Sequence, residues 1–214
     1  MTRMPAAARR EQLLDTAVSL FAERGFGGAT TAELAKAAGV TEPIIYRHFR
    51  SKKDLFIAVI QRAGRLTLDL WEHQLRDTDD PATRLKRLVT ANPMITHKGA
   101  GVYRVIVQAM TAVEDADILE ALRQHIVTLH DFVQKEVEYA QEQGQVSKGM
   151  SPSITAWMLL HLGLGYGLMA PLGIDGHATD ERGKRVRDVV LNLMLGERAK
   201  QLQDQWAKEE GTGH

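Results

Sequence analysis

Apolar residues recur at three- and four-residue intervals along most of the chain, which is the spacing of amphipathic helices. The first such segment is predicted to form a helix at about residues 7–24. Its apolar face carries Leu13, Ala17, Leu20 and Phe21, and Gly25 is placed to end it. No sustained alternation of apolar and polar residues bounded by turns is present, so we expect no strands. The pattern predicts an all-α fold.

Two short helices are predicted next, and the residues that open and close them are recognisable. Thr30 and Glu33 have the spacing of a capping box, in which each side chain bonds the other residue's backbone N–H. Gly39 breaks this helix, and Thr41 is placed to cap the following one. Pro43 is tolerated there because it falls in the first turn, where its missing N–H has no helical partner.

A long helix is predicted from Ser51 to about Arg76, because Ser51 and Asp54 repeat the capping pattern. Polar or glycine-containing breaks separate the later helices. These are expected at about residues 82–91, 101–113, 116–143, 152–170 and 180–207. We therefore expect an N-terminal domain of residues 1–53, continuing into the long helix, and a larger helical domain of residues 54–214.

Two short helices joined by a glycine-containing turn make a helix-turn-helix. In the second helix Ile45 and Phe49 lie four residues apart, so both should face the core with Leu34 and Val40. The residues of this helix that are left facing outward are unusual for a face that only meets solvent. They are Glu42, Pro43, Ile44, Arg47 and His48. In such units the start of the second helix reaches base edges in the major groove, and flanking polar groups hold phosphates. On this pattern alone, packed helices with ordinary surface residues remain an equal alternative.

The charge distribution favours a polyanion at the same end of the chain. Formal net charge is zero, but residues 1–53 carry nine Lys or Arg against five Asp or Glu, and the remainder carries 18 against 22. A balance of +4 on the helix-turn-helix segment suits DNA.

Residues 13–56, LLDTAVSLFAERGFGGATTAELAKAAGVTEPIIYRHFRSKKDLF, resemble the DNA-binding domain of the TetR family of transcriptional regulators. The resemblance is carried by LF and a glycine at Leu20, Phe21 and Gly25, by Thr30 and Thr31, and by GVT, IYRHF and SK between Gly39 and Lys52. It covers about the first quarter of the chain and implies a transcriptional regulator. The expected function is a ligand-released repressor that acts as a homodimer on a pseudo-palindromic operator of double-stranded DNA. The alternative is a helical ligand-binding dimer or enzyme without sequence-specific DNA binding.

The resemblance also implies roles for individual residues. Phosphate contacts are expected from Thr31, Tyr46, His48 and Lys52, and base readout is expected at or beside Thr41, Glu42, Pro43, Ile44 and Arg47. Ala32 cannot make the polar base contact that some members make, and Ile44 replaces a commonly polar residue. Glu42 either accepts a hydrogen bond from cytosine N4, which we favour, or stabilises the helix N-terminus.

The larger domain is expected to hold a pocket for a small-molecule effector. Candidate lining residues are Met94, Tyr103, Met110, Trp157 and His161, although Met and aromatic residues at helical spacing usually pack in a core. The last two long helices are expected to form the homodimer interface, because each carries more apolar surface than one core requires. Its candidate residues are Gly163, Gly167, Val186, Val190 and Leu193.

Other chemistries find little support in the sequence. The chain has no cysteine, which fits a reducing cytoplasm, and its start shows no secretory signal. The apolar run at residues 154–174 contains His161 and Pro171, so a membrane span is not expected. The eight histidines show no metal-ligand spacing, and no nucleophile motif is present. We expect no metal, no cofactor and no catalytic residue.

Overall fold

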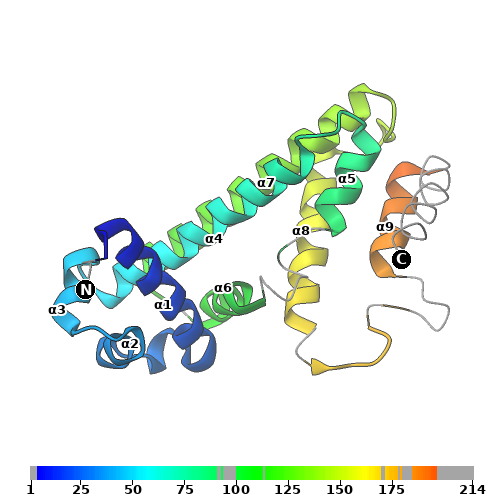
Figure 1. Cartoon of the computed structure of the whole chain (residues 1–214). Coiled ribbons are helices and arrows are strands. Elements are labelled where there is room, and N and C mark those ends of the chain that lie inside the picture. Colours follow the sequence, from blue (N-terminus) through cyan, green and yellow to red (C-terminus); the bar gives the residue numbers. More distant parts are fainter. Residues whose placement is uncertain are drawn as a thin grey trace, which may run out of the picture. The chain divides into compact units, whose positions relative to one another are not determined.

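The all-α expectation is confirmed by a computed structural model that describes residues 4–90, 93, 100–112, 114–169, 172–177, 179 and 185–196. These residues form nine helices, which Figure 1 labels. Their bounds are α1 Ala6–Gly28, α2 Thr31–Ala38, α3 Glu42–His48, α4 Lys52–Leu75, α5 Pro81–Thr90, α6 Ala100–Ala112, α7 Ala116–Glu142, α8 Pro152–Met169 and α9 Val186–Leu195.

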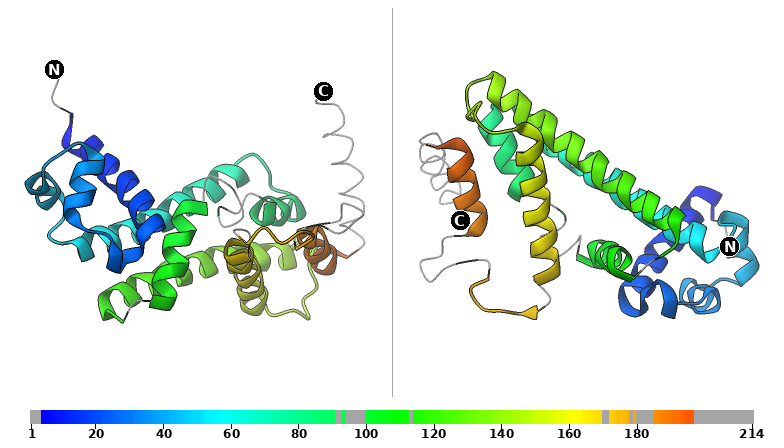
Figure 2. Two further views of the ribbon diagram at one scale, coloured as in Figure 1. Left: turned by 90° about the horizontal axis from the view of Figure 1, so that it is seen from below. Right: turned by 180° about the vertical axis from the view of Figure 1, so that it is seen from behind.

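The chain divides into two compact units, and each unit combines two separate stretches of the sequence. Unit 1 combines Met1–Leu66 with His97–Val127, and unit 2 combines Thr67–Thr96 with Thr128–His214. In unit 1, α1 packs against α2 and α6 (Figure 2), and α2 packs against α3. In unit 2, α5 packs against α9. Because α4 and α7 each run from one unit into the other, both helices contribute to two separate cores.

The predicted caps around α2 are present. Thr30 Oγ1 accepts from the Glu33 N–H at 3.2 Å, and Glu33 Oε2 accepts from the Thr30 N–H at 3.0 Å, which completes the capping box. Gly39 ends the helix in the left-handed conformation, with φ 65° and ψ 35°. The Asp54 N–H donates to Ser51 Oγ at 3.0 Å, which confirms the cap that opens α4.

Two local expectations differ from the structure. Thr41 occupies the N-cap position of α3, but its side chain makes no capping hydrogen bond, and only its carbonyl is used, by the Ile44 N–H at 2.9 Å. Gly25 breaks α1 without ending it. Its φ of 71° interrupts the helix, which then continues to Gly28. Glycine is suited to this kink because a side chain disfavours positive φ.

The core of unit 1 is built on aromatic contacts. Phe21 of α1 and Phe56 of α4 meet edge to face, with ring centroids 4.9 Å apart, and Phe26 packs 4.8 Å from Phe56. Ile45 in the middle of α3 and Phe49 just after its end are also buried, as their spacing predicted. The helix-turn-helix is therefore fixed from beneath by its own apolar residues.

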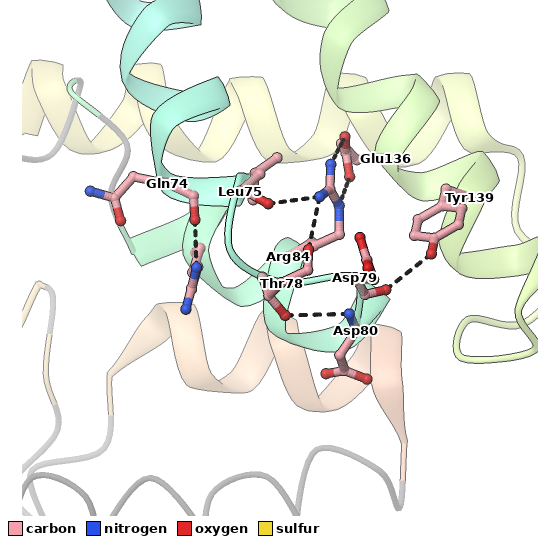
Figure 3. Close-up of polar contacts among 9 residues, drawn as sticks. Gln74, Leu75, Thr78, Asp79, Asp80, Arg84, Glu136 and Tyr139 are labelled. Carbon is pink, nitrogen blue, oxygen red and sulfur yellow. Dashed lines mark hydrogen bonds and ion pairs between the residues drawn. The ribbon is translucent and has the colours of Figure 1, made fainter.

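A polar cluster holds the corner between α4 and α5 in unit 2 (Figure 3). Arg84 of α5 donates from Nε and Nη2 to the two carboxylate oxygens of Glu136 on α7, both at 2.7 Å. Its Nη1 donates to the carbonyls of Leu75 and Thr78, at 2.9 and 3.0 Å. One guanidinium thus joins the end of α4, the turn after it and α7.

Candidate nucleic-acid interface

The face of α3 away from the core carries the predicted DNA-reading residues. Pro43, Tyr46 and Arg47 are exposed, as is Thr41 just before the helix. Glu42, Ile44 and His48 are half-buried, so neighbouring residues cover part of each. The exposed face therefore centres on Tyr46 and Arg47. Side chains of these types bond phosphate or base edges.

A short hydrogen-bond chain joins α2 to α3. Thr31 Oγ1 donates to Glu42 Oε2 at 2.8 Å and lies 3.2 Å from the Tyr46 hydroxyl oxygen. The single hydroxyl hydrogen of Thr31 goes to Glu42, so Tyr46 must be the donor in the second contact. The structure thus brings three predicted DNA-contact residues together. In this arrangement neither hydroxyl hydrogen is directed to a phosphate, and each must rotate to donate to one.

Lys52 has a structural contact that its sequence position did not reveal. Its Nζ donates to the carbonyls of Phe26 and Ala29, at 2.8 and 2.9 Å, and lies 4.6 Å from the Phe26 ring centroid. The first turn of α4 is thereby tied to the last turn of α1 and to the residue after it. An ammonium group has three N–H donors, so one remains for a phosphate.

Arg10 lies beside the end of α3 and was not among the predicted residues. Its guanidinium lies over the ring of Phe49, 5.0 Å from the centroid, just after α3 ends. Gln12, two residues on, donates to the carbonyl of Ala38 at the end of α2 at 3.2 Å. The Arg9–Arg10 pair within the positively charged segment is the sequence signal that could have identified this contribution.

Of the predicted effector residues, the structure brings together Trp157 and His161 but not the others. Met94 lies outside the described residues. Tyr103 is buried in unit 1, 6.0 Å from the His125 ring, and Met110 is exposed in the same unit. In unit 2 the Trp157 ring stacks on those of His130 and His161.

A cavity of about 250 Å³ lies elsewhere in unit 2. It is lined by Trp71, Leu88, Val89, Val133, Leu159, Leu160, Leu162, Gly163, Tyr166, Thr179, Arg185 and Arg187. None of the five predicted effector residues is among them. The cavity draws its lining from five helices and the segment before α9, so no local spacing marks it in the sequence.

The predicted dimer residues differ in accessibility. Gly163 is buried and lines the cavity, so its face of α8 is already covered within the subunit. Gly167, Val186 and Val190 are half-buried, and Leu193 on α9 is 75% exposed. Further exposed apolar side chains are Ile154, Met158, Leu168 and Met169 on α8 and Val189 on α9. The available apolar surface therefore lies at these side chains and at Leu193.

The described residues contain neither a metal-binding cluster nor a helix able to span a membrane. No group of three or more His, Cys, Asp or Glu is placed there to hold a metal ion. His130 is engaged within the protein, with Nδ1 3.0 Å from Asp131 and Nε2 3.0 Å from Ser153 Oγ. Within the same ranges, no helix is long and apolar enough to cross a bilayer.

A capped helix-turn-helix with an exposed Tyr-Arg face defines a DNA-binding protein. Residues 13–59 match the family model described as bacterial regulatory proteins, tetR family. The nucleoid occlusion factor SlmA of Marinobacter nauticus is 30% identical over 149 residues, which cover 70% of this chain and 74% of SlmA. The chain therefore belongs to the TetR family.

Two further relatives show how the likeness is distributed. The transcriptional activator FasR of Mycolicibacterium smegmatis is 40% identical over 105 residues, and this match spans about half of either protein, 49% of this chain and 48% of FasR. The crystal structure of AibR in complex with isovaleryl coenzyme A and operator DNA has a TM-score of 0.66 and 23% identity, and the alignment covers 87% of this chain and 98% of AibR. The fold is thus shared over nearly the whole of AibR.

Proposed function

We propose that the protein is a transcriptional repressor that binds a pseudo-palindromic operator as a homodimer and is released by a small molecule. The observation that carries this proposal is the exposed Tyr46-Arg47 face of α3, supported from beneath by Ile45 and Phe49. Residues 1–53 form the DNA-binding part in this proposal, and residues 54–214 bind the effector and the second subunit. The cytoplasm, where chromosomal DNA is accessible, is the proposed site of action.

The homodimer follows from the geometry of DNA. Two recognition helices enter successive major grooves when they lie one helical turn apart, about 34–36 Å. Exposed Ile154, Leu168 and Leu193 provide apolar surface for pairing α8 and α9 with a second copy. A ligand that binds better to a dimer with another spacing weakens operator binding by its difference in affinity for the two states.

The effector site in this proposal is the cavity of unit 2, since it is lined mainly by apolar residues and carries a few polar groups. AibR, which was solved with isovaleryl coenzyme A and operator DNA, provides a precedent for a family member that holds both. Turnover is not part of the proposal. The relatives above are a transcriptional activator and a nucleoid occlusion factor, and no catalytic residue is assigned.

Selection of bound duplexes from a random pool, at stated salt, tests the proposal directly. We expect an inverted repeat, and we expect Arg47→Ala to weaken binding to it by about 1–3 kcal/mol while relaxing preference at one base pair. Arg123→Ala, on the exposed face of α7, is the matched control and should bind as the wild type does. Equal affinity for selected and random duplexes would refute the proposal in favour of a ligand-binding protein or enzyme.

Two further measurements test the other parts of the proposal, which are dimer formation and repression. Sedimentation at low micromolar concentration should show a dimer, and a monomer that binds the selected site tightly would contradict the pairing. A reporter gene placed beside the selected site should be repressed by the protein. Binding without any effect on the reporter would instead favour a chromosomal role such as the one for which SlmA is named.

A further inference from the structure

The lining of the cavity in unit 2 has two chemically different parts. Most of it is aliphatic, and this part includes Leu88 and Val89 of α5, Val133 of α7 and Leu159 of α8. The polar part, called the polar end below, consists of Tyr166 of α8 with Thr179, Arg185 and Arg187, which lie before and at the start of α9. A lining with an apolar part and a cationic part suits a ligand with the same division.

Positive charge predominates at the polar end. Arg185 and Arg187 supply two guanidinium groups, and no carboxylate is among the described residues that line the cavity. Asp188 is the neighbouring acid, and it is engaged by Arg187 Nε at 3.4 Å and by the backbone N–H of Arg185 at 3.2 Å. Within the described part of the chain, one carboxylate against two guanidinium groups leaves a net positive charge.

Both guanidinium groups act on the same hydroxyl. Burial raises the pKa of Tyr166, while the charges of Arg187 and Arg185 act in the opposite direction and outrank the charge of Asp188, which also raises it. Their fields therefore reach the phenol, and the cationic groups converge on the polar end of the cavity. An anionic group placed beside Tyr166 would meet donors that are already charged or polarised.

Trp71 provides a separate indication that a polar ligand atom belongs here. Its side chain is 1% exposed and lines the cavity, yet its indole N–H has no hydrogen-bond partner among the described residues. Buried donors in proteins are almost always paired. A ligand oxygen that accepts from this N–H would satisfy it, whereas a purely hydrocarbon ligand would not.

We propose that this cavity binds an aliphatic carboxylate, with its carboxylate at Arg185 and Arg187, its chain among the leucines and valines, and an oxygen bonded to the Trp71 N–H. A volume of about 250 Å³ corresponds to roughly eight water-sized volumes, which suits a ligand of roughly eight to ten non-hydrogen atoms. The inference rests on the proposed function only in treating this ligand as the effector.

Calorimetric titration of the full-length protein with octanoate, 1-octanol and octylammonium tests the charge of the ligand. Octanoate should bind at least tenfold more tightly than 1-octanol, and octylammonium should not bind measurably. Arg187→Met should weaken octanoate binding by about tenfold or more and leave 1-octanol binding unchanged. Arg76→Met, an exposed arginine of the same unit that does not line the cavity, is the control and should bind octanoate as the wild type does.

Equal binding of octanoate and 1-octanol, or octanoate binding unaffected by Arg187→Met, would overturn the proposal. Trp71→Phe keeps the ring and removes the N–H, and it should weaken octanoate binding about threefold or more. Unchanged octanoate binding in that variant would show that the Trp71 N–H does not bond the ligand.

Operator binding measured in the same samples separates this inference from the proposed function. Octanoate that binds the cavity without changing DNA affinity would contradict the effector role and leave the ligand class standing. DNA release by a neutral or cationic compound alone would contradict the ligand class and leave the effector role standing.

Discussion

Gly64 in α4 and His125 in α7 approach so closely that a Cβ atom on Gly64 would lie 2.9 Å from Nδ1 of the imidazole. His125 is 5% exposed, and neither ring nitrogen has a hydrogen-bond partner among the described residues. Gly64 stands within a continuous helix, so the backbone does not require a glycine there. The missing side chain makes room for the imidazole of the other helix.

We expect Gly64→Ala to lower the free energy of unfolding by about 1–3 kcal/mol, because the added methyl overpacks the contact with His125. The matched test repeats the substitution in a His125→Ala background. There the clash is gone, and Ala should stabilise the helix relative to Gly by up to about 1 kcal/mol. Denaturant unfolding of the four proteins gives the comparison. An equal loss in both backgrounds would show that the imidazole is not the cause.

Stability should also depend on pH through His125. Burial lowers the pKa of His125 to about 4, whereas an unfolded histidine titrates near 6.5. Between these values the unfolded chain binds a proton that the folded protein does not, so stability falls as pH drops from about 6.5 to about 4. The gap from 6.5 to about 4 corresponds to about 3 kcal/mol at most.

The check is a series of urea unfolding curves from pH 7 to pH 4. His125→Leu should flatten the part of the pH dependence that this residue contributes. His73→Leu, at an exposed histidine of α4, should leave the wild-type slope unchanged. A steep slope that survives in His125→Leu would assign the effect to other groups.

The ion pair of Arg84 and Glu136 should make each partner costly to remove alone (Figure 3). The two side chains are 20% and 13% exposed, so Arg84→Met leaves a largely buried carboxylate and two carbonyls without their donor. We expect a loss of about 2–4 kcal/mol in the free energy of unfolding. The double variant Arg84→Met/Glu136→Leu should lose less than Arg84→Met does, since it no longer buries an unpaired charge. If the double variant instead lost the sum of what Arg84→Met and Glu136→Leu each lose alone, this account would be contradicted.

The parts of the fold that were predictable depend on local signals. Thr30 and Glu33 cap α2, and Gly39 ends it, because each acts on backbone groups within a few residues of itself. The exposed face of α3 followed from the four-residue spacing of Ile45 and Phe49. Such features depend on helix geometry alone, so the sequence is sufficient to find them.

The parts that were not predictable depend on contacts between distant segments. Lys52 bonds carbonyls 23 and 26 residues earlier, and a single sequence carries no mark of that pairing. The cavity brings Trp71 of α4 together with Arg187 of α9, so it exists only once the helices have packed. Gly163 illustrates the same limit, because its spacing does not say which side of α8 the subunit covers.

Lys52→Met should reduce both stability and DNA affinity. Loss of the two hydrogen bonds to Phe26 and Ala29 should lower the free energy of unfolding by about 1–3 kcal/mol. If the third N–H meets a phosphate, binding should weaken on all duplexes alike and the salt slope should fall by about one. Lys135→Met, at an exposed lysine of α7 in unit 2, is the control for both measurements. Reduced stability with an unchanged salt slope would limit Lys52 to its structural contact.

Glu42 offers the sharpest test of how α3 reads DNA. In the structure its carboxylate accepts from Thr31 at 2.8 Å, and Thr31 is in turn bonded to Tyr46. The carboxylate therefore positions Thr31 directly and Tyr46 through Thr31, and both are predicted to contact phosphate. Its negative charge, however, opposes the approach of DNA. Glu42→Gln keeps an oxygen that can accept from Thr31 and removes the charge.

Because Thr31 already occupies the carboxylate, the expectation for Glu42 changes from base readout to support of Thr31. We therefore expect Glu42→Gln to bind all members of a panel of single-base operator variants more tightly, by about 0.3–1 kcal/mol, with base preference unchanged. Glu42→Ala also removes the charge, but it releases Thr31 and Tyr46, so its gain should be smaller or absent. Tyr46→Phe serves as the control for loss of the Tyr46 hydroxyl, the last group of this hydrogen-bond chain. Titration of each variant against the whole panel at one salt concentration gives the comparison. A change confined to variants at a single cytosine would instead assign Glu42 to base readout, because only a direct contact to one base discriminates at one position.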